Sequence, residues 1–257
     1  MNINRRKFLK ITGVATAALA IKSASDLLDD SDFITALHAE EAEGIKEGVK
    51  WGMLIDLRKC DECKKCVEAC RSAHNIPEFN NLKDQVDWIW LIDFEKAFPE
   101  QFHKFMREDL ENKKVPILCN HCDDAPCVKV CPTKATWKRE DGIVMMDYHR
   151  CIGCRYCMAA CPYGSRSFNW RNPRPYIREI NEDFPTRMKG VVEKCNFCAE
   201  RLREGKQPAC VEACDRGAMI FGDLNDENSE IRKKLKEEYA IVRKPAMGTH
   251  PNIYYII

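Results

Sequence analysis

The sequence predicts an α+β fold built from two similar double modules, and three observations predict it. All sixteen cysteines of the 257 residues fall into four groups of four. A short apolar segment precedes each group, and the cysteine-containing stretches repeat in residue type as well as in spacing. A repeated strand, loop and short helix is the pattern of an α+β domain made from copies of one unit.

The first element is an N-terminal segment that is basic and then apolar. Arg5 and Arg6 are followed by Lys-Phe-Leu-Lys, and the apolar stretch Ile11–Ile21 comes next. The apolar run is too short to span a bilayer, and the whole segment resembles a twin-arginine export signal rather than a simple amphipathic helix. We expect residues 1–47 to be this signal and a polar linker, cleaved after Ala20 or further along. This resemblance implies export in the folded state by the twin-arginine translocase and an extracytoplasmic location.

The cysteine groups differ only in the gap between their second and third members. The first and third groups read C-x2-C-x2-C-x3-C, whereas the second and fourth have gaps of four and eleven residues. The groups are Cys60, Cys63, Cys66 and Cys70; Cys119, Cys122, Cys127 and Cys131; Cys151, Cys154, Cys157 and Cys161; and Cys195, Cys198, Cys210 and Cys214. The pentapeptide Cys-Val-Glu-Ala-Cys occurs twice, at 66–70 and at 210–214, which supports four copies of one unit.

This spacing predicts iron-sulfur ligation. In the bacterial ferredoxin run C-x2-C-x2-C-x3-C, three sulfurs hold one 4Fe-4S cluster and the fourth ligates the neighbouring cluster. Pro132 and Pro162 follow the fourth cysteine of the second and third groups, as in that run, whereas Arg71 and Asp215 stand there in the outer groups. Sixteen thiolates therefore predict four 4Fe-4S clusters in two ferredoxin-like double-cluster modules.

Three other uses of cysteine compete with this interpretation, and the weakest is a C-x2-C redox dithiol, because such sites use one pair rather than four groups. An exported chain with an even cysteine count is compatible with disulfides, although closely spaced runs of three cysteines pair poorly with one another. C-x2-C pairs also bind zinc, but zinc sites leave no use for a third cysteine inside one run.

Short strands are expected around the cysteine groups, and together they define a four-cluster domain over residues 48–222. The apolar segments before the groups are 51–57, 115–118, 142–146 and 190–192, and further ones follow at 167–170 and 218–221. Aromatic residues crowd the insertion 75–114, which favours core over a partner surface. Residues 223–257 are expected to form a charged surface helix over 229–239 and a tail.

Two histidines adjoin the cysteine groups. His121 lies inside the second group and His149 precedes the third. Because every cluster already has four sulfurs, we expect these side chains to be hydrogen-bond donors to a cluster or ordinary surface groups rather than ligands.

At this point the four groups, over residues 51–222, resemble the four-cluster iron-sulfur subunits of membrane oxidoreductases of the dimethyl sulfoxide, polysulfide, tetrathionate and nitrite reductase type. The resemblance implies that ligands cross between groups, first with fourth and second with third. The implied sets are Cys60, Cys63, Cys66 and Cys214; Cys195, Cys198, Cys210 and Cys70; Cys119, Cys122, Cys127 and Cys161; and Cys151, Cys154, Cys157 and Cys131.

One branch of this family matches further motifs. The segments Trp88–Pro99, Phe221–Asp226 and Gly248–Tyr255 look most like the iron-sulfur subunit of the sulfite-reductase-associated, heterodisulfide-reductase-like menaquinol oxidoreductase complex. This resemblance implies a non-catalytic electron-transfer subunit, with no catalytic residue and no small-molecule substrate of its own. The implied partners are a polytopic quinone-binding membrane subunit and a cytochrome c or other redox subunit at the periplasmic face. The alternatives are the electron-transfer subunit of a molybdopterin reductase and a self-contained reductase.

The net charge argues against nucleic-acid binding and predicts that the cluster-loaded protein is acidic. The formal net charge is +1, with 41 basic and 40 acidic residues, so the chain lacks the basic excess of a nucleic-acid-binding protein. Removal of residues 1–20, which hold four basic residues and no acid, changes this to −3, since 1 − 4 = −3. Four oxidised clusters with thiolate ligands would add about −8, giving about −11. Basic residues near the groups, including Arg155 and Lys194, are expected to offset this charge and to raise the reduction potential of the nearest cluster.

Overall fold

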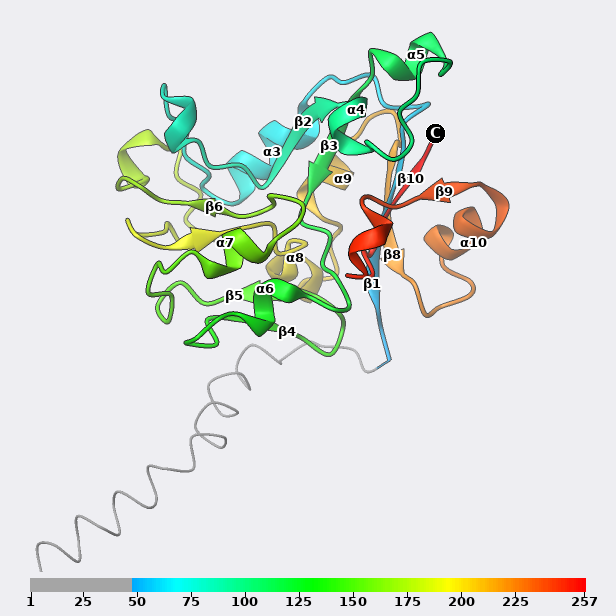
Figure 1. Cartoon of the computed structure of the whole chain (residues 1–257). Coiled ribbons are helices and arrows are strands. Elements are labelled where there is room, and N and C mark those ends of the chain that lie inside the picture. Colours follow the sequence, from blue (N-terminus) through cyan, green and yellow to red (C-terminus); the bar gives the residue numbers. More distant parts are fainter. Residues whose placement is uncertain (1–47) are drawn as a thin grey trace, which may run out of the picture. The chain divides into compact units, whose positions relative to one another are not determined.

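The central sheet joins both ends of the described chain, which is residues 48–257 of this computed structural model. Its strand order is β8-β1-β10-β9, as Figure 1 shows on the side that also carries α10. β1 (Trp51–Asp56) pairs antiparallel with β8 (Met219–Asp223) and parallel with β10 (Ile253–Ile256), and β10 pairs with β9 (Ala240–Ile241). Met53 therefore lies opposite Phe221 on one side and Ile253 on the other. A strand flanked on both sides is buried along its length, which explains the continuous apolar run in β1.

Three two-stranded sheets complete the strand content. They are β2 (Ile89–Asp93) with β3 (Lys114–Leu118), β4 (Thr136–Lys138) with β5 (Val144–Met146), and β6 (Ser167–Phe168) with β7 (Val192–Glu193), all antiparallel. Each apolar segment predicted before or after a cysteine group overlaps one of the strands of these sheets or of the central sheet. The mixed helix and strand content agrees with the predicted α+β class.

Short helices begin within or beside the cysteine groups. They are α3 (Lys65–Ala73), α6 (Pro126–Lys129), α7 (Tyr156–Ala160), α8 (Ala199–Arg203) and α9 (Ala209–Glu212). Lys64 and Arg155 precede α3 and α7 in the same left-handed conformation, with φ of 64° and 63°. Because both residues stand between the second and third cysteines of their groups, the sequence repeat is also a repeat of backbone geometry.

The remaining elements lie in the insertion and the C-terminal segment. They are α4 (Phe94–Ala97), α5 (Glu108–Glu111), α10 (Glu230–Glu237) and 3₁₀ turns at Leu82–Asp84, Arg174–Tyr176 and Pro245–Met247. The expected charged surface helix is α10, and its capping residue Ser229 accepts a hydrogen bond from the Arg232 amide. The tail after it supplies β9 and β10, so it shares the central sheet with β1.

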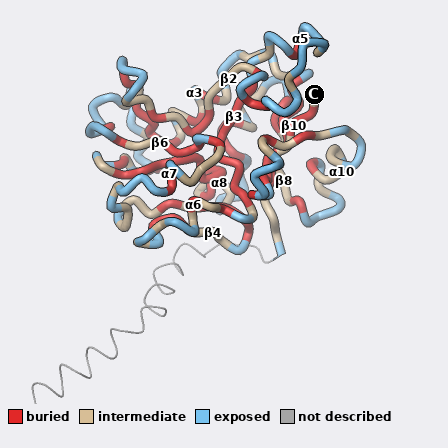
Figure 2. Tube along the Cα trace, in the orientation of Figure 1, coloured by how far each residue is buried: buried red, intermediate tan, exposed pale blue. Residues whose placement is uncertain are grey.

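Buried residues run through the middle of the described residues, as the red segments in Figure 2 show, and they form three hydrophobic clusters. The largest cluster includes Trp88, Phe94 and Phe98 from the aromatic insertion, all buried. Phe105 of the same insertion is 81% exposed. Most aromatic side chains of the insertion thus belong to the core or pack against it, as its aromatic content favours. Among residues 48–257, no helix is long and apolar enough to cross a membrane.

Candidate iron-sulfur centres

The first and fourth cysteine groups meet beside the edge of the central sheet. Burial and then the neighbouring Cys60, Cys214 and Cys63 thiols raise the pKa of Cys66 to about 12. Cys214 likewise contributes to the raised pKa of Cys60, after burial. The structure therefore brings the implied set of Cys60, Cys63, Cys66 and Cys214 into one neighbourhood, where Cys63 is exposed.

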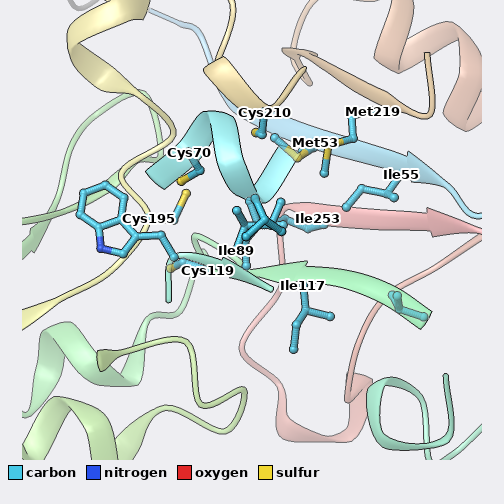
Figure 3. Close-up of a cluster of buried hydrophobic side chains, with 14 of the residues drawn as sticks. Met53, Ile55, Cys70, Ile89, Ile117, Cys119, Cys195, Cys210, Met219 and Ile253 are labelled. Atoms are coloured by element: carbon cyan, nitrogen blue, oxygen red, sulfur yellow. The ribbon is translucent and has the colours of Figure 1, made fainter. Parts of the chain in front are cut away.

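The remaining members of these two groups form a second, fully buried neighbourhood. Burial is the main reason that the pKa of Cys70 lies well above its ordinary value, followed by the thiols of Cys195, Cys198 and Cys210. Figure 3 shows the sulfurs of Cys70 and Cys195 pointing toward each other from α3 and from the loop before α8. Cys70 is supplied by the first group, so the first and fourth groups do exchange a cysteine in space.

The second and third groups meet in the same way. Burial and then the thiols of Cys119, Cys127 and Cys161 raise the pKa of Cys122 to about 12, against a hydrogen bond to Thr249 that lowers it. Cys161 belongs to the third group, yet it lies among the cysteines of the second. The third set implied by the resemblance is therefore assembled.

Three cysteines of the fourth implied set are brought to one region of the core. Cys157 lies near Cys151 and also near Cys127, whose thiols both raise its pKa after burial. Cys131 packs against the same hydrophobic cluster as Cys151 and Cys157. Cys154 is exposed.

The four neighbourhoods follow one another in a single order. The Cys66 thiol helps to raise the pKa of Cys70 and of Cys210, so the first neighbourhood adjoins the second. In the same way Cys119 helps to raise the pKa of Cys195, so the second neighbourhood adjoins the third. Cys127 helps to raise the pKa of Cys157, so the third neighbourhood adjoins the fourth. The exposed Cys63 and Cys154 stand in the first and last neighbourhoods, while most cysteines of the middle two are buried.

The local backbone suits thiolate ligands. All sixteen cysteines are free thiols. Backbone amides of Phe197, Ala209 and Ala218 donate to the sulfurs of Cys195, Cys198 and Cys214 at 3.4, 3.4 and 3.3 Å. Amide hydrogen bonds to sulfur stabilise negative charge on a cluster and help to set its potential. Four groups of four sulfurs with such donors fit four 4Fe-4S clusters.

The two histidines singled out in the sequence have different environments. His121 is fully buried, stacks on Phe197 at 3.7 Å between ring centroids and accepts a hydrogen bond from the Val144 amide at 3.0 Å. Burial holds the pKa of His121 well below its ordinary value, with help from the nearby charges of Lys194 and Arg166. Nδ1 accepts the Val144 hydrogen bond, so this nitrogen carries no proton. His149 is exposed.

A third histidine adjoins a cysteine although its sequence context did not mark it. His74 is buried, with its Nδ1 3.7 Å from the Cys70 sulfur and its Nε2 2.8 Å from the Glu200 carboxylate. The only cue in the sequence was its place one helical turn after Cys70, which puts both residues on one face of α3. The carboxylate fixes the ring orientation beside the second neighbourhood.

Comparison with known families agrees with this geometry. Two models described as 4Fe-4S dicluster domains match residues 59–135 and residues 110–176 with 178–224, and a twin-arginine translocation signal model matches residues 2–21. The chain belongs to the family of iron-sulfur subunits that contain 4Fe-4S dicluster domains. This family membership confirms the four 4Fe-4S clusters, the two double-cluster modules and the export signal, and it removes disulfides and zinc as explanations of the cysteines.

Several relatives within the family match most or nearly all of the chain. The Hdr-like menaquinol oxidoreductase iron-sulfur subunit 1 of Archaeoglobus fulgidus is 38% identical over 98% of this chain and 97% of its own length. A tetrathionate reductase subunit of Salmonella typhimurium is 35% identical over 100% of this chain and 89% of its own length. A Halobacterium salinarum protein named as a dimethyl sulfoxide reductase iron-sulfur subunit is 42% identical over 80% of this chain and 78% of its own length. Each of these names describes a subunit of an oxidoreductase, and this agrees with an electron-transfer role of the chain within such a complex.

Proposed function

We propose that this chain relays single electrons between a quinone-linked membrane subunit and a redox partner outside the cytoplasm, such as a cytochrome c. The observation that carries the proposal is the single order of the four cysteine neighbourhoods, with an exposed cysteine in the first and in the last. A relay needs buried intermediate carriers and a terminal carrier within reach of each partner. The buried cysteines of the middle two neighbourhoods and the exposed cysteines Cys63 and Cys154 support this arrangement.

The ligands proposed for the relay are the crossed sets. Cys60, Cys63, Cys66 and Cys214 would hold the first centre and Cys195, Cys198, Cys210 and Cys70 the second. Cys119, Cys122, Cys127 and Cys161 would hold the third, and Cys151, Cys154, Cys157 and Cys131 the fourth. Each 4Fe-4S cluster supplies one-electron chemistry when bound. The protein holds the centres in order, shields the inner ones from water and adjusts their potentials through amide donors and charges.

Two observations support a role in the menaquinol oxidoreductase branch: the length of the sequence match to its iron-sulfur subunit, and the export signal. The match to the Archaeoglobus protein spans nearly the full length of both chains, and the N-terminal signal model places the chain on an export route. We therefore propose a location at the periplasmic face of the cell membrane, held there by partner subunits. The chain has no catalytic residue of its own in this proposal.

The test is menaquinol-dependent reduction of the clusters in the native complex. The complex would be isolated from membranes through a tag on the C-terminus of this chain, and cluster reduction would be followed by electron paramagnetic resonance after menaquinol is added. We expect reduction in the complex and none in the purified subunit alone. Absence of reduction in an intact complex with four clusters would overturn the quinone-linked role.

The second candidate is the electron-transfer subunit of a molybdopterin reductase, and the tetrathionate reductase and dimethyl sulfoxide reductase relatives favour it. The same preparation decides between the two. Molybdenum in the complex, with cluster oxidation by tetrathionate, polysulfide or nitrite, would establish the second candidate. Reduction of a small substrate by the purified subunit with an artificial donor would instead establish a self-contained reductase.

A further inference from the structure

Three buried cations of the described residues have no carboxylate partner. Lys194, Arg166 and Arg243 are 1%, 4% and 3% exposed, and no ion pair within 4.0 Å joins any of them to an acid of residues 48–257. The fourth buried cation, Arg187, pairs with the equally buried Glu193. A buried charge without a counter-charge is strongly unfavourable, so something else must compensate these three.

None of their hydrogen-bond partners is a carboxylate. Lys194 donates to the carbonyls of Val144 and Cys195, the latter at 2.6 Å. Arg166 donates to the Thr136 hydroxyl at 2.8 Å and to the Met146 sulfur at 3.7 Å, and it also hydrogen-bonds the sulfurs of Cys127 and Cys157. Arg243 Nε donates to the Ala97 carbonyl at 3.3 Å. These partners orient the three side chains, and none of them supplies a carboxylate counter-charge.

The three cations lie beside the two middle cysteine neighbourhoods. Arg166 lies near Cys127, Cys157 and Cys119, and its charge lowers the pKa of Cys157 although burial raises it overall. Lys194 acts in the same direction on Cys195 of the second neighbourhood. Arg243 stacks over the Tyr163 ring at 5.5 Å, and Tyr163 lies beside Cys122 and Cys161. Lys194 therefore adjoins the second neighbourhood, and Arg166 and Arg243 adjoin the third.

The first neighbourhood has the opposite arrangement. Three cations near it, Lys65, Arg216 and Lys113, are each paired with a carboxylate, from Asp215, Asp61 and Glu62 respectively. Lys65 and Arg216 are also well exposed, so water screens them further. Arg155, which the sequence marked equally with Lys194, is exposed and lies over Trp170 at 4.8 Å.

We infer that Lys194 and Arg166 are positioning charges that raise the reduction potentials of the second and the third centre respectively, the centres assigned to the sets that contain Cys195 and Cys127. Reduction adds one negative charge to a centre, so a fixed neighbouring cation stabilises the reduced form more than the oxidised form. The effect is large here because both cations are shielded from water and have no carboxylate to cancel them. The inference rests on cluster binding and not on the identity of the complex.

The test uses the purified, cluster-loaded full chain and mediated redox titrations followed by electron paramagnetic resonance. We expect Lys194→Met and Arg166→Met to lower the midpoint potentials of two different components, each by about 59 mV or more, a tenfold change in its one-electron equilibrium. Lys194→Arg and Arg166→Lys keep the charge and should shift those components far less. Lys234→Met, an exposed cation on α10, is the matched control and should shift none.

The titrations need no quinol or partner subunit, so they are independent of the menaquinol experiment. Unchanged potentials in Lys194→Met and Arg166→Met would overturn the inference, and so would a shift of one and the same component in both variants. Equal shifts in the charge-keeping variants would also overturn it, because the effect would then come from packing. If a methionine variant loads fewer clusters, full loading of its charge-keeping counterpart supports the inference and equal loss in both contradicts it.

Discussion

Glu193 accepts hydrogen bonds from three buried donors and ties the aromatic insertion to the third and fourth cysteine groups. Trp88 Nε1 donates to it at 2.9 Å and Arg187 Nε at 2.7 Å, and Asn169 donates to its other oxygen. Arg187 in turn donates to the carbonyls of His74 and Asn75. This ion pair is fully buried, so each charge depends on the other for compensation.

Glu193→Gln should therefore destabilise the protein strongly. It leaves the Arg187 charge buried and uncompensated, at a cost of about 3–5 kcal/mol. The measurement is the temperature at which the loaded protein loses its cluster absorbance, which falls by roughly 2–4 °C per kcal/mol for a chain of this size. Lys96→Met, which removes an exposed pair with Asp93, is the control and should cost less than about 1 kcal/mol. Equal losses in both variants would contradict the assignment.

Asp56, the last residue of β1, makes stability depend on acid. Burial alone would raise its pKa, but hydrogen bonds from the Arg58 side chain and amide outweigh burial and hold the pKa below its ordinary value of 3.8. A carboxylate whose pKa is lower in the folded state stabilises the protein above its unfolded pKa, and this contribution disappears as pH falls through the folded pKa. We expect the wild-type unfolding temperature to fall below about pH 4, and Asp56→Asn to be less stable at pH 7 with a shallower acid dependence. A parallel acid dependence in both proteins would show that other carboxylates are responsible.

At the scale of elements, Gly153 holds the third ligand loop against the segment before β7. Its φ is +69°, and a Cβ placed on it would lie 2.3 Å from the Gly190 carbonyl oxygen and 3.2 Å from the Phe168 ring. Gly164 has a similar φ of +66° but open space around it, which makes it a matched control. Both alanine variants place a side chain on a residue in the left-handed backbone region, which costs free energy. Only Gly153→Ala also forces the Gly190 backbone to move.

Gly153→Ala is therefore expected to lose the cluster of the third group's first three cysteines. Iron analysis should give roughly twelve atoms per chain instead of sixteen, with one electron paramagnetic resonance component missing. Gly164→Ala should retain all four clusters. Full iron content in Gly153→Ala would show that the Gly190 segment moves without disturbing the ligands.

Elements were predictable where the sequence pattern was local. The strands beside the cysteine groups, the helix after Ser229 and the aromatic core of the insertion follow from short apolar runs, a capping serine and burial preference. The pairing of β10 with β1 was not predictable in this way, because it joins residues about two hundred positions apart and nothing in Ile253–Ile256 marks its partner. His74 was missed for a similar reason, since Glu200 reaches it from a distant helix.

At the scale of the whole molecule, cluster loading should change the net charge. The signal-free chain has a formal charge of −3 and four bound clusters add about −8, while cluster-free thiols are neutral. The loaded protein is therefore expected to migrate much faster toward the anode in native electrophoresis than the same chain after chelation of its iron. Equal mobility of two folded forms would mean that protonation or bound cations cancel the cluster charge.

The sequence alone determined the cofactor of this protein, because ligand spacing is a local property that a few residues of backbone enforce. Four groups of four cysteines predict four 4Fe-4S clusters with no residue left over. Only the tertiary structure decided which groups meet, which cysteines reach the surface and which cations are buried. Arg155 and Lys194 illustrate the difference, since both adjoin cysteines in the sequence but only Lys194 is shielded from water. Burial depends on how distant segments pack together, and the strength of a charge depends on burial.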